Sequence, residues 1–154
     1  MDDVDDRQVV HRQLRDGGFL GRLGTCERWW WSRGRCRLRL PDAFPRHIAD
    51  LRPDRRRHIL DGDGPNKGGG HRPGVGKAGK TEFPADWTDD DIIRRVMQTA
   101  MRPDRVEPSF GKFVALARHD GVTVRVVVRA DGHVWTAYPL PGGKGVVQNP
   151  GAKT

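Results

Sequence analysis

Two histidines flank a glycine-rich stretch, and their type and spacing suit acid-base chemistry. His58 opens the run His-Ile-Leu-Asp-Gly-Asp, and His71 directly follows three glycines. Histidine serves as general base and as general acid near neutral pH, because its unperturbed pKa is about 6.5. Attack of an RNA 2′-hydroxyl on its own phosphodiester needs one group of each kind and a cation near the phosphate. The pair therefore indicates phosphodiester transesterification.

The same stretch also offers ligands for a metal ion. Asp61 and Asp63 lie between the two histidines, and imidazole and carboxylate groups together bind divalent ions. A metal-dependent nuclease that uses this loop is therefore one alternative. A non-catalytic RNA-binding module is another, because a basic surface alone binds phosphates.

Residues 74–81, Gly-Val-Gly-Lys-Ala-Gly-Lys-Thr, satisfy the phosphate-loop pattern of nucleotide-binding proteins. Such a loop needs a strand before it and a helix that begins at its lysine. Here a glycine-rich stretch precedes the loop, and Pro84 would interrupt a helix begun at Lys80. Nucleotide hydrolysis is therefore not expected.

A helix that helps to position these residues is predicted after residue 88. Thr88 is a good helix N-cap, and Asp91 occupies the capping-box position three residues later. Apolar residues then recur at three- and four-residue spacing until Pro103 ends the pattern. We expect this helix to pack an apolar stripe against the core.

Three strand-like runs follow, at residues 112–118, 122–129 and 133–138. Asp-Gly pairs at 120–121 and 131–132 join them, and Asp-Gly between alternating apolar runs is a strong hairpin signal. The expected fold class is α+β, with a small helical N-terminal part followed by an antiparallel β-meander.

Two-residue turns would set the register of this meander. The predicted cross-strand pairs are Thr136 with Val127, Tyr138 with Arg125, Val134 with Arg129, and Lys112 with Arg129. One sheet face would then carry groups suited to phosphate, namely Lys112, Arg125, Arg129, Thr136 and Tyr138. The opposite face would form the core with Phe113, Ala115, Ala117, Val122, Val124, Val126, Val128, Trp135 and Ala137.

The N-terminal part of the chain differs in character. The 154 residues carry a net charge of +8, which favours a polyanionic partner. Residues 1–47 are rich in Arg and lack a sustained apolar period, so we expect a linker-like or disordered leader without assigned function, and a folded domain over residues 48–154. Cys26 and Cys36 match no zinc-ligand spacing. Neither a membrane-spanning segment nor a Sec signal is expected.

An ordered set of motifs resembles the bacterial EndoU ribonuclease domain. In chain order the motifs are His-Ile-Leu-Asp-Gly-Asp at 58–63, Gly-Gly-His-Arg at 69–72, Lys-Thr-Glu-Phe-Pro at 80–84, Trp87, Asp-Gly-Val at 120–122 and Thr-Ala-Tyr-Pro at 136–139. The resemblance extends from about His58 to Pro150. It implies the α+β fold that barnase-like and RelE-like ribonucleases share.

The resemblance also implies an activity. It points to an endoribonuclease that cuts RNA, often at uridines, and leaves a 2′,3′-cyclic phosphate without a cofactor or with weak stimulation by Mn²⁺. By position, His58 and His71 correspond to the acid/base pair with their individual roles open, and Thr136 and Tyr138 correspond to a Thr-x-Tyr motif that contacts uracil and phosphate.

Relatives outside bacteria use a lysine as a third catalytic residue, and Lys112 is our candidate for it. Lys112 lies about forty residues after His71 and on the predicted face of Thr136 and Tyr138. Arg72 and Arg125 are the candidates for a phosphate clamp.

Bacterial EndoU domains commonly form the C-terminal part of polymorphic toxins, including those of contact-dependent growth inhibition. The resemblance therefore implies an RNA substrate such as tRNA, a cognate immunity protein, and delivery as an effector into the cytoplasm of a target cell.

Overall fold

The computed structural model describes residues 40–65 and 67–151. The predicted leader up to residue 39, with Cys26 and Cys36, lies outside this description. The elements follow in the order α1 (Pro53–Leu60), β1 (Thr81–Glu82), α2 (Asp89–Met101), β2 (Arg105–Ser109), β3 (Lys112–His119), β4 (Val122–Arg129), β5 (Val134–Pro139) and β6 (Val147–Gln148). The predicted α+β class is confirmed.

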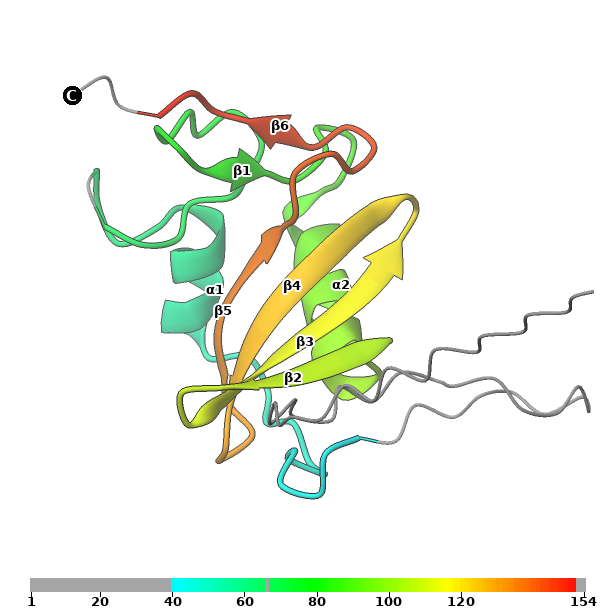
Figure 1. The fold of residues 1–154 in the computed structure, drawn as a ribbon. Helices are drawn as coiled ribbons and strands as arrows, with labels where there is room; N and C mark the ends of the chain where they lie inside the picture. Colours follow the sequence, from blue (N-terminus) through cyan, green and yellow to red (C-terminus); the bar gives the residue numbers. More distant parts are fainter. Residues whose placement is uncertain (1–39, 66, 152–154) are drawn as a thin grey trace, which may run out of the picture. The chain divides into compact units, whose positions relative to one another are not determined.

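The main sheet is an antiparallel meander of β2, β3, β4 and β5, and β1 pairs with β6 in a separate two-stranded sheet (Figure 1). The sequence predicted β3, β4 and β5 but neither β2 nor the small sheet. Strand β2 contains Pro108, which weakens a strand pattern, and it is an edge strand, where proline is tolerated. Strands β1 and β6 have two residues each, too few to show alternation.

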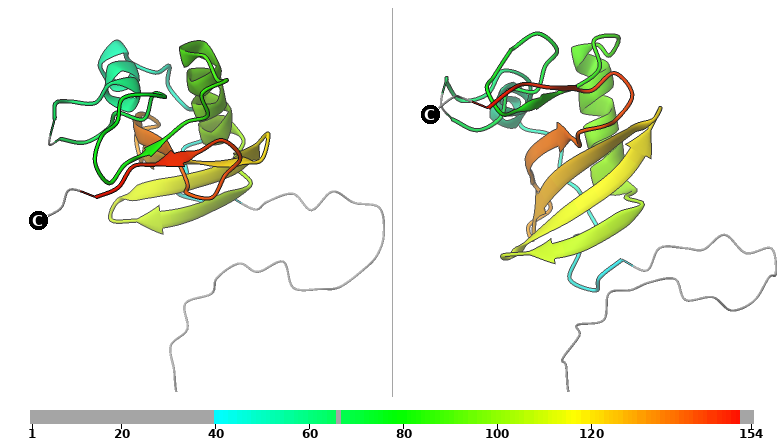
Figure 2. Two further views of the ribbon diagram at one scale, coloured as in Figure 1. Left: turned by 90° about the horizontal axis from the view of Figure 1, so that it is seen from above. Right: turned by 45° about the horizontal axis from the view of Figure 1, so that its top comes forward.

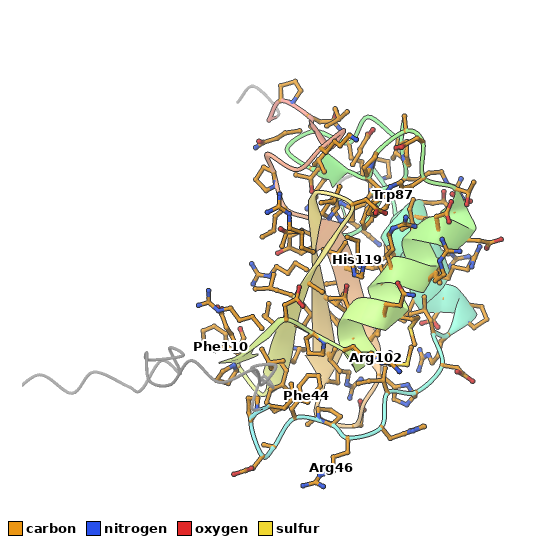
Figure 3. All side chains as sticks on the ribbon, turned by 90° about the vertical axis from the view of Figure 1, so that its right-hand side faces the viewer. Phe44, Arg46, Trp87, Arg102, Phe110 and His119 are labelled. Carbon is orange, nitrogen blue, oxygen red and sulfur yellow. The ribbon has the colours of Figure 1, made fainter. Side chains whose placement is uncertain are left out.

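Both helices lie on one side of the main sheet (Figure 2). Helix α2 packs on β3 and β4, and its buried residues Ile92, Val96 and Ala100 confirm the predicted apolar stripe. Phe44 also belongs to this core, where its ring meets that of Phe113 edge-on at 5.5 Å (Figure 3). Each fully buried large apolar side chain contributes about 1.5–3 kcal/mol to stability.

The predicted start of α2 is confirmed at atomic level. The Thr88 hydroxyl accepts a hydrogen bond from the backbone N–H of Asp91 at 3.2 Å. The Asp91 carboxylate in turn accepts from the backbone N–H of Thr88 at 3.2 Å. This capping box satisfies two N–H groups that lack partners within the helix.

The register is partly as predicted. Thr136 pairs with Val127 and Tyr138 with Arg125, as expected. Lys112 also pairs with Arg129, on the other side of β4.

The prediction for Val134 and Trp135 was wrong. Val134 pairs with Val128 rather than Arg129, and Trp135 is 43% exposed instead of buried.

A longer turn and a bulge account for this error. The backbone N–H of Arg129 donates to His133 O at 2.9 Å, so three residues rather than two form the turn and the pairing shifts by one. A β-bulge at Trp135 then shifts the pairing back, which restores the predicted partners of Thr136 and Tyr138.

In the described part of the chain, no helix has the length and apolar character needed to cross a membrane.

Candidate active site

The C-terminal end of α1 holds the chain segment that carries His71. The carbonyl oxygens of the last turn of a helix lack partners within the helix. Here the oxygens of His58, Ile59 and Leu60 accept hydrogen bonds from the backbone N–H groups of residues 70, 71 and 72 at 3.0, 2.9 and 3.0 Å. The segment after the glycine-rich stretch therefore runs along the end of α1, and the two histidines lie close together.

Glycine is required for this close approach. Gly69 has a φ of +75°, and a Cβ atom there would lie 1.9 Å from the carbonyl oxygen of His58. Any L side chain at this position would collide with the backbone of α1 and would also strain the loop. The glycine-rich stretch is thus a packed segment that places His71 relative to His58.

His58 and His71 line one cavity of about 450 Å³ between α1, the glycine-rich stretch and the ends of β1 and β5. Both imidazoles are largely buried, at 7% and 5% exposed. Thr136 and Tyr138 of β5 also line this cavity, because residues two apart on a strand point to the same side. The further lining residues are Gly68, Gly69, Gly79, Lys80, Thr81, Trp135, Pro139, Pro141 and Gln148.

Asp63 and Thr136 orient the His58 ring. The distance from Nδ1 to the Asp63 carboxylate is 2.6 Å, and the distance from Nε2 to the Thr136 hydroxyl is 3.1 Å. The hydrogen bond with His58 lowers the pKa of Asp63, so this carboxylate is ionised at neutral pH. A carboxylate only accepts hydrogen bonds, and Nδ1 is therefore the donor. His58 consequently presents Nε2 to the Thr136 side of the cavity.

Thr81 and Tyr138 hold the His71 ring. Nδ1 donates to the backbone carbonyl of Thr81 at 2.6 Å, and the ring stacks on Tyr138 with 5.5 Å between centroids. Burial lowers the pKa of His71, the charges of Lys80 and His58 lower it further, and the hydrogen bond to Thr81 opposes them. His71 is therefore neutral at neutral pH, with its proton on Nδ1 and a lone pair on Nε2.

Residues 67–141 match the family model described as bacterial EndoU nuclease. This segment is similar to the bacterial EndoU nuclease family. The resemblance found in the sequence is thereby confirmed for these residues, and the family supports nuclease chemistry. Searches of curated proteins and of solved structures returned no match. His58 lies before the matched segment and reaches the cavity of His71 through α1. We call the cavity that His58 and His71 line the EndoU cavity.

The structure does not bring Lys112 into the EndoU cavity. Lys112 begins β3, and its Nζ lies 5.7 Å from the centre of the Trp135 ring, in a second cavity. It shares a sheet face with Thr136 and Tyr138, as the register predicted, but β4 lies between β3 and β5. A shared face therefore does not imply a shared site.

Arg72 and Arg125 also lie outside the lining of the cavity. Two carboxylates bind the Arg72 guanidinium, Asp61 at 2.8 Å and Asp89 at 2.8 and 3.0 Å, so Arg72 ties the loop to the start of α2. The Arg125 guanidinium lies 5.6 Å from the centre of the Tyr138 ring. Arg125 can therefore hold the Tyr138 ring in place through a cation–π contact.

Lys80 is a cation of this cavity that the sequence analysis did not single out as a site residue. Among the described residues that line the EndoU cavity, only Lys80 carries a permanent positive charge. Its charge is close enough to His71 to lower the histidine's pKa. The signal was present, because Lys80 belongs to the phosphate-loop pattern that was set aside.

Glu82 binds the first glycines of that pattern. Its carboxylate accepts hydrogen bonds from the backbone N–H groups of Gly74 at 2.7 Å and Gly76 at 2.5 Å, and from the Asn149 side chain at 2.8 Å. Burial opposes ionisation of Glu82, but these hydrogen bonds outweigh it and lower its pKa. The first part of the loop therefore binds a carboxylate of its own chain.

The ligand set of the metal alternative is not assembled. Asp61 pairs with Arg72 and Asp63 with His58, so the two carboxylates serve different partners. Within residues 40–65 and 67–151, no three His, Cys, Asp or Glu side chains gather closely enough to hold a metal ion.

Proposed function

We propose that the EndoU domain is an endoribonuclease that cleaves RNA by attack of the 2′-hydroxyl on the adjacent phosphodiester. One observation carries the proposal. Two buried histidines line a single cavity, and each has its Nδ1 engaged by an acceptor, so that Nε2 serves for proton transfer. Uridine recognition by Thr136 and Tyr138 is part of the proposal and rests on the family's Thr-x-Tyr motif.

His71 acts as the general base in this proposal. Its lowered pKa keeps Nε2 unprotonated at neutral pH. Nε2 takes the proton of the 2′-hydroxyl, and the 2′-oxygen forms a bond to phosphorus. Removal of this proton by a positioned base contributes about 10²–10⁴-fold to the rate.

His58 acts as the general acid. The ionised Asp63 carboxylate at Nδ1 orients the ring, as the aspartate of a Ser-His-Asp triad orients its histidine. Nε2–H gives its proton to the 5′-oxygen as the bond from phosphorus to that oxygen breaks. The products are a 2′,3′-cyclic phosphate and a free 5′-hydroxyl.

Lys80 stabilises the negative charge that develops on the phosphate oxygens. Its ammonium lines the same cavity as both histidines. In a largely buried site, such a preorganised cation stabilises the transition state more than it would in water. We propose Lys80 for the role that the sequence reasoning gave to Lys112.

Product analysis in EDTA tests the proposed reaction. The full chain is incubated with a uridine-containing RNA in EDTA, and the ends are identified by mass spectrometry. We expect 2′,3′-cyclic phosphate and 5′-hydroxyl ends, and no cleavage where a single 2′-deoxyuridine replaces the uridine. Loss of activity in EDTA with 5′-phosphate ends would instead indicate a metal-dependent nuclease. Binding without cleavage would indicate an RNA-binding module.

We further propose that the domain acts as a bacterial toxin that a cognate immunity protein neutralises, after delivery into the cytoplasm of a target cell. The family resemblance is the support for this role. Expression of the chain in the bacterial cytoplasm should arrest growth and fragment RNA such as tRNA, and His71→Ala should relieve both effects. Growth arrest by the His71→Ala variant would contradict the proposal.

A further inference from the structure

Phe110 occupies a position that folding alone does not favour. It forms a two-residue turn with Gly111 between Ser109 and Lys112, and its φ is +44°. Asn, Asp and Gly adopt this left-handed conformation readily, whereas a bulky aromatic residue does so at a cost. The side chain recovers none of this cost by packing, because Phe110 is 100% exposed. Figure 3 shows it at the end of the β2–β3 hairpin, directed away from α2.

A second exposed aromatic residue shares this surface. The β-bulge turns Trp135 out of the core, and the indole is 43% exposed. Phe110 and Trp135 line one open cavity of about 580 Å³ together with Gly111, Lys112, Arg129, Ala130 and Asp131. We call this set of residues the aromatic surface.

The aromatic surface also carries positive charge. Lys112 Nζ and the Arg129 guanidinium lie 5.7 and 6.0 Å from the centre of the Trp135 ring. Arg129 pairs with Asp131 at 3.3 Å, so this carboxylate is already engaged and the charge of Lys112 is added to the surface. Exposed aromatic rings beside cations are the combination that binds single-stranded nucleic acid, through base stacking and phosphate contacts.

Trp135 connects the aromatic surface to the EndoU cavity. Trp135 lines both the cavity of His58 and His71 and the cavity of Phe110. An RNA strand with its scissile phosphate between the histidines can therefore continue past Trp135. This continuity, together with Lys112, favours RNA over a protein partner as the occupant.

We propose that the aromatic surface is a subsite for the nucleotides that flank the cleaved bond. Flanking bases stack on Phe110 and Trp135, and Lys112 and Arg129 contact the adjoining phosphates. This inference rests on the proposed ribonuclease function and extends it: the site favours single-stranded RNA longer than a dinucleotide.

Phe110→Asn is the decisive variant, because asparagine suits the left-handed turn and removes the ring. We expect its melting temperature to equal or exceed that of the wild type. Its affinity for a twelve-nucleotide 2′-O-methyl RNA, which cannot be cleaved, should fall about fivefold or more. Cleavage of the dinucleotide UpA should be unchanged. Lys112→Ala should show the same pattern, and Lys144→Ala, an exposed lysine that lines neither cavity, should resemble the wild type.

Wild-type affinity for the twelve-nucleotide RNA in both Phe110→Asn and Lys112→Ala would overturn the inference. An equal loss of UpA cleavage would also overturn it, because the effect would then arise in the catalytic cavity. The affinity for the 2′-O-methyl RNA is measured without any cleavage, so it reports on the subsite alone. If the wild type does not cleave UpA, the proposed function fails, and the binding comparison still tests the subsite.

Discussion

The two histidines differ in the group that engages Nδ1. His58 donates to an ionised carboxylate, whereas His71 donates to a neutral backbone carbonyl. Burial next to Lys80 lowers the pKa of His71 and so favours its neutral ring, as a base requires. These contacts are the basis on which we propose His58 as the acid and His71 as the base, roles that the spacing of the two histidines in the sequence left open.

The pH dependence of cleavage reports on His71. The base must be neutral, and burial lowers its pKa from the ordinary value of 6.5, so inactivating protonation occurs only below that pH. We therefore expect the acid limb of the kcat/KM profile for UpA to lie below pH 6.5. Circular dichroism at each pH shows that the protein stays folded over the range used. An acid limb at or above 6.5 would contradict the assignment of His71 as base.

Lys80→Ala should change two observables together. Loss of a preorganised charge in the site should lower kcat for UpA by about 10²–10³-fold. Because the charge of Lys80 lowers the pKa of His71, the acid limb of the variant should also move toward higher pH. Lys144→Ala serves as the control, with wild-type kcat and acid limb. A Lys80→Ala variant with wild-type kcat would remove Lys80 from the mechanism.

At the scale of elements, the glycine-rich stretch acts with α1 as one unit. Backbone hydrogen bonds from residues 70–72 complete the end of the helix and simultaneously set the distance between the histidines. The small sheet of β1 and β6 then supplies the carbonyl of Thr81 that orients His71. Side-chain geometry in the site thus depends on backbone contacts around it.

Gly69→Ala and Gly74→Ala form a matched pair that tests this close approach. Both positions have positive φ, +75° and +84°, but a Cβ meets the His58 backbone at residue 69 and no atom within 4 Å at residue 74. Gly74→Ala should lower the free energy of unfolding by about 1–2 kcal/mol through strain alone. Gly69→Ala should lose about 1–3 kcal/mol more from overpacking. Urea denaturation measures both, and equal losses would contradict the packed approach.

Glu82→Gln tests the internal anion of the loop. The carboxylate accepts from two backbone N–H groups and from Asn149, and an amide cannot accept with both of its terminal atoms. We expect a loss of about 1–3 kcal/mol in the free energy of unfolding at pH 7. Since the folded pKa is lowered, the wild type should lose this advantage as the pH falls below 4.5, and the two proteins should then converge. A constant difference down to pH 3 would contradict this account.

At the scale of the whole molecule, the sequence predicted what depends on local pattern. The capping box of α2, its apolar stripe and the antiparallel strands all follow from periodicity and turn chemistry. The predicted leader and the boundary at residue 48 stay predictions, although Phe44 packs in the core.

Features that depend on contacts between residues distant in the sequence could not be predicted from local patterns. The three-residue turn and the bulge changed the pairing of Val134 and exposed Trp135. Only three-dimensional proximity distinguishes Lys80 from Lys112. The bulge also exposes Trp135 between the two cavities. The proposed extension of the catalytic site toward Phe110 therefore depends on a feature that the sequence did not predict.

The most direct test of the account is a change of leaving group. We propose cleavage of UpA and of its analogue with sulfur in place of the bridging 5′-oxygen, by the wild type and by His58→Ala and His71→Ala. A thiolate leaves without protonation, because thiols have a pKa of about 8.5. On UpA, both variants should lose about 10²–10⁴-fold in rate. On the sulfur analogue, His58→Ala should recover most of the wild-type rate and His71→Ala should not. Recovery by His71→Ala instead, or near wild-type cleavage of UpA by either variant, would contradict the account.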